Sequence, residues 1–289
     1  MRRFSDLNPI VILTYYLCVL FVTMFSMNPV ILLISMLSSV TVYSIYTDKT
    51  TKAHIFSIGL FIILALINPI IVHNGATVLF YINGSAFTME ALIYGVTAAV
   101  MVTASLYHLR SLSRDITADK LQYIFGRFSP KLALILSMAL RMTSLFKSRW
   151  RCIQDSQKAL GLYTDGNLID AVRGRARVLS ILITWSLENG IITAESMDAR
   201  GYGSRRRTSF AVYRMRLGDA LILAAVVALT GLGIAGLCTA RIRYYPTISA
   251  QLFDPLSIAG YCAFGILCIL PLIINIKEAI KWRCSISKI

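Results

Sequence analysis

Long apolar stretches, nearly free of charged residues, constrain this sequence more than any motif does. Each is about 20 residues long, the length that lets an α-helix cross the hydrocarbon core of a bilayer. Since Asn28-Pro29 separates the first two, and proline ends or kinks a helix, these two form either a hairpin or one long broken element. The predicted spans, five to six in number, are 9–27, 29–47, 53–72, 91–109, 217–240 and 256–276.

The composition places the chain among membrane proteins. With 56% hydrophobic and 15% charged residues over 289 positions, and a mean hydropathy of +0.67, it is too apolar for an ordinary soluble domain of this size. We therefore predict an all-α, polytopic integral membrane protein. The first stretch opens with Asn8-Pro9 and no clear small-residue cleavage site follows, so we expect it to stay in the mature protein. The six cysteines show no close pairing and are expected to be reduced.

The formal net charge of +15 is distributed unevenly. Lysine and arginine crowd the segment between the fourth and fifth spans, including its two ends at 110–114 and 205–216. Because cytoplasmic loops carry an excess of these residues, both ends are expected in the cytoplasm, and with six spans both chain termini are cytoplasmic too. Only Arg241 and Arg243 fall on the opposite side. The basic residues lie beside spans without a nucleic-acid-binding signature, so membrane lipids are an expected partner and nucleic acid is not.

The segment between the fourth and fifth spans carries two long helical patterns. The first runs from Pro130, with Ser129 as its N-cap, toward Gly161, a residue suited to the left-handed conformation that ends many helices. The second runs from about Leu168 to residue 200, and Gly201 ends it in the same way. Both helices are therefore long and have defined C-terminal tips.

Neither of these helices is a good membrane span. The apolar part of the second, 178–187, is about half the required length, and Arg141 would be costly within a membrane in the first. A turn at 165–167 joins them, so they can pack along their apolar stripes as a hairpin or a crossed pair. We interpret the packed side of the second helix as the one that carries Val172, Ala176, Leu179, Ile183, Leu187, Ala194 and Met197.

The C-terminal tip of the second helix is suited to contact another molecule. Ala199 allows close backbone approach, Arg200 offers a planar fork of hydrogen-bond donors, and Gly201 ends the helix so that the arginine stands at an edge. The negative end of the helix dipole also favours an arginine here, so a purely structural capping role for Arg200 is the alternative.

Two stretches, "SMALRMTSLFKSRWRCIQDSQKALGL" before the first tip and "AESMDARGYG" at the second, resemble the transmembrane T component of energy-coupling factor transporters, the family of the membrane subunits of cobalt and vitamin uptake systems. The likeness is strongest over 130–203. It implies cytoplasmic coupling helices whose Ala-Arg-Gly tips dock on two ABC ATPase subunits, identical or different, and a separate substrate-binding membrane S component. It also implies the plasma membrane of a bacterium or archaeon. The chain then divides into N-terminal transmembrane helices at 1–112, a coupling-helix region at 113–212 and C-terminal transmembrane helices at 213–289.

The resemblance also implies roles for individual residues. Leucine stands at the first tip where the family has arginine, and it cannot donate hydrogen bonds, so Arg200 is expected to be the stronger anchor. The implied ATPase-docking residues are Ala199, Arg200 and Gly201 at the second tip, and Ala159, Leu160 and Gly161, with Lys158 beside them, at the first. Motion of both tips would reach the S component through a coupling surface that includes Leu136, Phe146, Leu179 and Ile183.

This chain is expected to be a non-catalytic subunit without a cofactor or metal site of its own, since ATP and Mg²⁺ would bind to the partner ATPases. One pattern, "GLGIAG" at 231–236, has dinucleotide-binding spacing, but it lies in an apolar span and predicts close helix packing. The three histidines are interpreted as helix-end or loop residues rather than metal ligands: His54, His73 and His108.

Two other function classes stay open. A membrane enzyme that acts on lipid phosphates would use the basic face, although its candidate residues form no recognisable acid, base or metal pattern: Arg141, Arg151, Asp155 and Glu195. A substrate-binding permease acting alone fits less well, because solute paths commonly hold ionisable side chains and these spans have few. The transported substrate, a vitamin or a transition-metal ion, stays open, as do the pairing of the ATPases and whether the S component is dedicated or shared.

Overall fold

The computed structural model describes residues 4–46, 51–72, 75–82, 85–162, 168–204, 213, 215–245, 247, 249–251 and 254–286. The chain forms two compact units. The membrane unit comprises Met1–Lys120 and Tyr213–Ile289, and the central unit comprises Leu121–Val212. The turn expected at 165–167, the basic residues 205–207 and His73 lie outside the described residues.

Among the residues that the structure describes, six apolar helices form the membrane unit, and each begins within two residues of a predicted span. In the described residues five of them are long and apolar enough to cross a membrane, and α1 is a shorter apolar helix of 17 residues. The prediction of an all-α polytopic membrane protein is therefore confirmed. The helices are α1 (Pro9–Phe25), α2 (Pro29–Tyr46), α3 (Thr51–Ile71), α4 (Met89–Asp115), α8 (Leu217–Thr239) and α9 (Pro255–Ile286).

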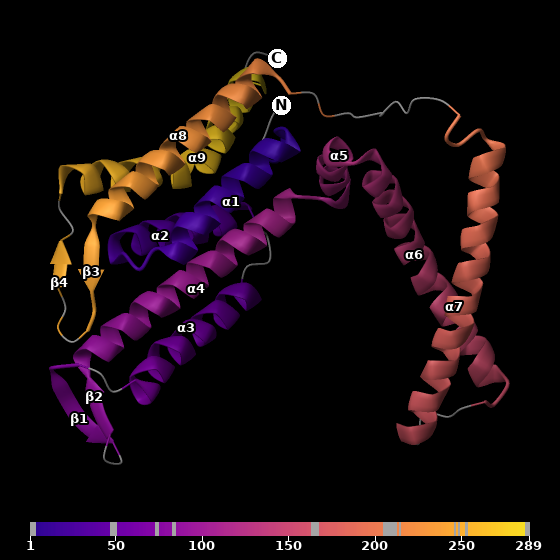
Figure 1. Ribbon diagram of the computed structural model, residues 1–289, viewed down its shortest axis with the longest axis horizontal. Helices are drawn as coiled ribbons and strands as arrows, with labels where there is room; N and C mark the ends of the chain where they lie inside the picture. Colours follow the sequence, from indigo (N-terminus) through magenta and orange to yellow (C-terminus); the bar gives the residue numbers. More distant parts are fainter. Residues whose placement is uncertain are drawn as a thin grey trace. The chain divides into compact units, whose positions relative to one another are not determined.

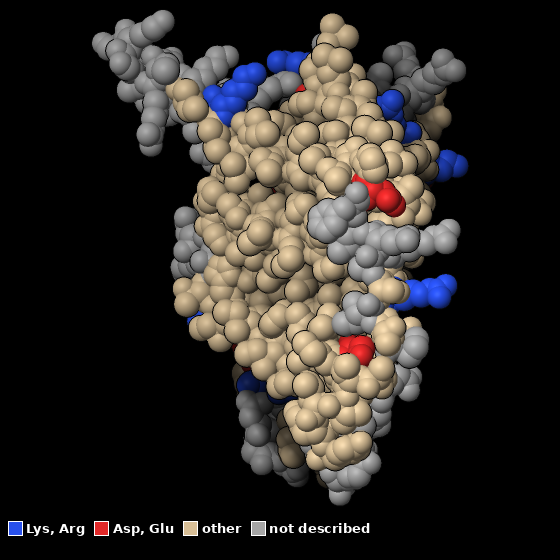
Figure 2. Space-filling model, turned by 90° about the vertical axis from the view of Figure 1, so that its left-hand side faces the viewer, with Lys and Arg blue, Asp and Glu red and all other residues tan. Residues whose placement is uncertain are grey.

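Short elements join these helices. A 3-10 helix, η1 (Phe4–Asp6), precedes α1. One antiparallel hairpin, β1 (Val78–Ile82) with β2 (Ser85–Thr88), connects α3 to α4, with Tyr81 opposite Ala86. A second, β3 (Arg241–Arg243) with β4 (Ser249–Gln251), connects α8 to α9, with Ile242 opposite Ala250. Figure 2 shows one face of the molecule, and most of its described surface is uncharged. Such a surface is suited to contact with lipid.

The helix α4 lies between α3 on one side and α1 and α2 on the other (Figure 1). It contacts α1, α2 and α3, while α8 and α9 pack on each other, α8 also contacts α1, and α9 also contacts α2. In the most apolar 18-residue stretch of α4, half of the residues are buried, a larger fraction than in the other candidate spans. The apolar core between α1, α8 and α9 includes Phe4, Tyr15 and Phe264, and the rings of Phe4 and Tyr15 meet edge to face at 5.2 Å.

The first two spans form a hairpin rather than one broken helix. Asn28 caps α2 by accepting a hydrogen bond from the Val30 amide at 3.0 Å, and its side-chain amide donates to the Tyr261 hydroxyl of α9 at 2.6 Å. Across the hairpin, the hydroxyls of Thr23 and Ser35 are 3.0 Å apart. These bonds fix the turn, because buried polar groups without partners would be costly in this apolar setting.

His108 on α4 continues this polar contact. Its Nε2 atom lies 3.0 Å from the Ser35 hydroxyl, and both residues are buried. His54, near the start of α3, has its Nδ1 atom 2.7 Å from the hydroxyl of Tyr107 on α4. The interpretation of His108 as a helix-end or loop residue is therefore wrong: it joins α4 to α2 inside the bundle.

Close packing between α8 and α9 confirms the prediction for the "GLGIAG" segment at one glycine in particular. A Cβ atom added at Gly236 would lie 2.7 Å from the Cα atom of Gly260 and 2.9 Å from the Leu256 carbonyl oxygen. At Gly233 it would make an ordinary contact with Phe264 at 3.8 Å, and at Gly231 it would have no atom within 4 Å. Small residues let the two backbones approach at Gly236.

The central unit contains α6 (Pro130–Ala159) and α7 (Leu168–Ala199), in agreement with the two predicted helices. They are preceded by α5 (Ala118–Phe128), a helix of 11 residues that the sequence analysis did not predict. It begins just before the boundary between the units at residue 120.

We expect Gly236→Ala to destabilise the packing of α8 on α9. The added methyl group would overlap the Gly260 backbone, and overpacking of this kind costs about 1–3 kcal/mol. The thermal midpoint of the detergent-purified protein should fall, whereas the control Gly231→Ala on the same helix should leave it unchanged. An unaltered midpoint for Gly236→Ala would show that the helices do not approach this closely.

Candidate partner-docking site

The C-terminal tip of α6 is closed by a double hydrogen-bonded turn. Gly161 has a φ of +65°, the left-handed region that glycine adopts without strain. Its amide donates to the carbonyl of Lys158 at 2.9 Å, and the amide of Leu162 donates to the carbonyl of Gln157 at 3.1 Å. These are the two bonds of the Schellman motif, in which Leu160 is the C-cap residue.

The tip of α7 has the same geometry. Gly201 has a φ of +80°, its amide donates to the carbonyl of Asp198 at 2.9 Å, and the amide of Tyr202 donates to the carbonyl of Met197 at 3.0 Å. Arg200 therefore occupies at this tip the position that Leu160 occupies at the other. Both predicted stop glycines thus end their helices as expected.

The two tips have the same backbone hydrogen bonds but different side chains at the C-cap. Leu160 is an apolar side chain that is 70% exposed at this tip. Arg200 is exposed, and its guanidinium has no hydrogen bond or ion pair within the described part of the chain. One tip therefore offers an apolar side chain, and the other offers a planar group with five N–H donors.

The helices α6 and α7 cross near their middles, and their tips point in opposite directions (Figure 1). The rings of Phe146 and Trp185 meet edge to face at 6.1 Å, and the Arg149 guanidinium lies 5.1 Å from the Trp185 ring centre. One turn further along α7, the Asn189 amide contacts the sulfur of Met142, which lies one turn earlier on α6, at 3.5 Å. The helices are therefore antiparallel, and each tip lies about 20 Å from this crossing at a rise of about 1.5 Å per residue.

The structure thus brings together the residues within each predicted tip, and it does not bring the two tips together. Ala159 and Ala199 end their helices beside the C-cap residues, and Lys158 lies in the last turn of α6. The enzyme candidates Asp155 and Glu195 are also separated, since they lie roughly 14–15 Å from the crossing in opposite directions.

The face of α7 that packs inside the central unit differs from the predicted one. The buried residues of α7 are Ala171, Gly174 and Val178, at the three-and-four spacing that continues to Trp185. The predicted stripe is instead largely exposed, with Leu187 at 66%. That interpretation is wrong, because two of the three buried residues, Ala171 and Gly174, are small and add little to an apolar pattern.

The predicted coupling surface remains a prediction, and the structure shows where its residues lie. Leu179 and Ile183 are about half exposed on α7, with relative exposures of 48% and 52%. Phe146 contacts Trp185 within the helix pair, and Leu136 is half-buried. Exposed large apolar side chains also occur at Ile191 and elsewhere on α7, so this helix presents an apolar face that no described residue of the central unit covers.

Within the described ranges, no group of three or more His, Cys, Asp or Glu side chains is placed to hold a metal ion. The five cysteines whose side chains the structure describes are unpaired. Among the functional features that sequence reasoning missed, the largest is the aromatic and cationic contact at the crossing, formed by Phe146, Arg149 and Trp185. The three-residue step from Phe146 to Arg149, which places both on one side of α6, could have indicated it.

We expect Gly201→Ala to loosen the tip of α7. An L-residue in the left-handed conformation costs about 1–2 kcal/mol, so the Tyr202 amide should exchange its hydrogen about tenfold faster. Hydrogen–deuterium exchange on the peptide around 197–204 measures this. Gly190→Ala is the matched control, because it lies in the same helix with no atom within 4 Å of the added Cβ. Equal exchange in both variants would contradict the role of the glycine.

Comparison with known proteins gives a family and several relatives. The family model for CbiQ, cobalt transport protein, matches residues 2–210. Energy-coupling factor transporter transmembrane protein EcfT 1 of Listeria monocytogenes is 26% identical over 193 residues, which cover 62% of this chain and 71% of that protein. The EcfT protein of Listeria innocua is 33% identical over 104 residues, which cover 35% of this chain and 39% of that protein. The EcfT protein of Streptococcus thermophilus is 32% identical over 108 residues, which cover 37% of this chain and 41% of that protein.

Proposed function

We propose that this chain, which belongs to the CbiQ family of cobalt transport proteins and is a transmembrane component of the energy-coupling factor type, transmits ATP-driven motion to a substrate-binding membrane subunit. In this proposal two cytoplasmic ABC ATPases hydrolyse ATP, and the chain itself carries no catalytic group. The separate S component selects the cargo, a vitamin or a transition-metal ion. Bacterial or archaeal plasma membrane, with both termini in the cytoplasm, is the proposed location.

The matched tips of α6 and α7 are the observation that carries this proposal. Each tip exposes one side chain just before a left-handed glycine, and the tips lie at opposite ends of the crossed pair. Two contact points that are both about 20 Å from the crossing suit two separate partners rather than one. When the two ATPases approach each other on binding ATP, both ends of the crossed pair would move together.

The packing of α6 on α7 supports transmission of that motion. The crossing is held by a ring pair and by a cation over the Trp185 ring, so a displacement of either tip turns both helices about one point. The exposed apolar side chains of α7, such as Leu179 and Ile183, would then move against the S component. Sliding along an apolar surface is possible because such contacts are not directional.

The chemistry of the tips suggests two unequal docking sites. Arg200 is suited to pair with a carboxylate through two parallel hydrogen bonds, whereas Leu160 is suited to an apolar groove. Two different ATPase subunits would accommodate this difference directly. Two identical subunits would have to accept either side chain in the same groove.

We expect Arg200→Ala to weaken association with the ATPase subunits at least about tenfold, the effect of losing one charge-assisted contact, and to abolish transport while the protein still inserts. Pull-down of co-expressed ATPases from mild detergent measures this. Arg177→Ala, which removes an exposed arginine elsewhere on α7, should leave pull-down unchanged. Retention of the ATPases by Arg200→Ala would argue against this docking role, and turnover of a lipid phosphate by the isolated chain would favour the enzyme instead.

We expect Leu160→Arg to be tolerated or to strengthen the contact at the first tip. The C-cap geometry of the two tips is the same, so an arginine at residue 160 would be presented as at residue 200. The same pull-down assay, with Leu160→Ala beside it, distinguishes the possibilities. Loss of assembly in Leu160→Arg would show that this tip docks in a closed apolar pocket.

A further inference from the structure

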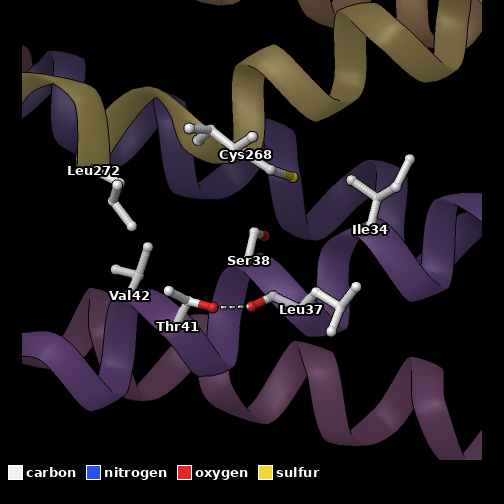
Figure 3. Close-up of a pocket in the computed structure, with 8 residues that line it drawn as sticks. Ile34, Leu37, Ser38, Thr41, Val42, Cys268 and Leu272 are labelled. Carbon is white, nitrogen blue, oxygen red and sulfur yellow. Dashed lines mark hydrogen bonds between the residues drawn. The ribbon is translucent and has the colours of Figure 1, made fainter.

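An apolar groove follows the seam between α2 and α9 in the membrane unit (Figure 3). Its volume is about 420 Å³, and its apolar lining includes Ile34, Leu37 and Val42 from α2 and Cys268, Ile269 and Leu272 from α9. Figure 3 shows Val42 and Leu272 pointing toward each other across it.

The two hydroxyl groups that line the groove already donate their hydrogen bonds to backbone carbonyls. The Ser38 hydroxyl donates to the Ser35 carbonyl at 3.1 Å, and the Thr41 hydroxyl donates to the Leu37 carbonyl at 2.6 Å. An apolar chain therefore suits it.

A polar cavity of about 250 Å³ lies where the same seam continues. It is lined by Ser5, Tyr46, Arg114, Asp115 and Asn275. On α2, Tyr46 lies one helical turn beyond Val42, and on α9, Asn275 lies one turn beyond Leu272. The apolar groove and the polar cavity thus follow each other along one seam.

Asp115 holds the guanidinium of Arg114 in one orientation and leaves part of it unused. The Nε and Nη2 atoms of Arg114 donate to Oδ1 of Asp115 at 3.0 and 2.9 Å, and the Tyr16 hydroxyl donates to Oδ2 at 2.7 Å. The Nη1 atom of Arg114 is buried and has no acceptor among the residues that the structure describes. A buried donor without an acceptor is costly, so an oxygen ligand is favoured at this end of the seam.

The ammonium of Lys120 donates to the carbonyl oxygens of Ser5 and Asp115, and Asp6 and Asp115 are the carboxylates that act on it. What Arg114 therefore lacks is an acceptor for its Nη1 donor.

We propose that this seam binds one glycerophospholipid, with a phosphate oxygen accepting a hydrogen bond from Arg114 and an acyl chain in the α2–α9 groove. The ligand carries a chain because the groove lies between two helices that are apolar and long enough to cross a membrane. It carries a phosphate because a neutral lipid would bring no anionic acceptor to the guanidinium. This site lies wholly in the membrane unit and does not depend on ATPase docking.

Native mass spectrometry of the full-length protein in mild detergent tests the site with three probes: phosphatidylglycerol, diacylglycerol with the same chains, and glycerol 3-phosphate. Phosphatidylglycerol should bind about tenfold more tightly than diacylglycerol, the change that one charge-assisted hydrogen bond produces. Glycerol 3-phosphate, which has no chain, should not be retained. Equal binding of phosphatidylglycerol and diacylglycerol, which is the behaviour of general lipid contact, would overturn the proposal, as would retention of glycerol 3-phosphate.

Two matched pairs of variants locate the binding. Arg114→Gln should reduce phosphatidylglycerol binding to the level of diacylglycerol, whereas Lys52→Gln, which removes an exposed positive charge at the start of α3, should not. Leu37→Trp should block the groove, whereas Leu33→Trp, on an exposed α2 residue outside the groove, should not. Because Leu37→Trp leaves the charges intact, it tests the site even if Arg114→Gln fails to fold. Equal binding by Leu37→Trp and Leu33→Trp would contradict the proposed site.

Discussion

The left-handed turn that ends both α6 and α7 determines what these helices present to other proteins. In each turn the second residue after the C-cap returns its amide to a carbonyl five residues earlier, and a glycine with positive φ makes that return possible. The C-cap side chain is therefore left at the end of the helix, facing away from it. Leu160 and Arg200 differ as completely as two side chains can in hydrogen bonding, yet they occupy the same place in this turn.

In the proposed function, the crossing of α6 and α7 links the motion of one tip to that of the other. A long helix is stiff, but two helices move as one body only if their contact resists sliding. Here the contact includes the rings and the cation at Phe146, Arg149 and Trp185, and α7 also buries Val178. It leaves the apolar side chains on the other faces of α7 exposed, and the proposed contact with an S component would cover them.

Much of this structure could be predicted because it depends on local sequence. The positions of the spans follow from the apolar stretches. The start of α6 follows from Pro130, and the C-terminal ends of α6 and α7 follow from Gly161 and Gly201. The packed face of α7 could not be predicted from apolar periodicity, since the buried residues Ala171 and Gly174 add little to an apolar pattern. The partner of His108 could not be predicted either, because Ser35 lies 73 residues away in the chain. Contacts of that kind are set by the tertiary arrangement.

Photocross-linking from the two C-cap positions tests the central claim most directly. A photoreactive amino acid at position 160 or 200, in protein co-expressed with its ATPases, should form a covalent product with an ATPase subunit from each position. If the ATPases differ, each position should select one of them. Products with lipid or with this chain alone, from both positions, would contradict the claim that these tips dock on a separate motor.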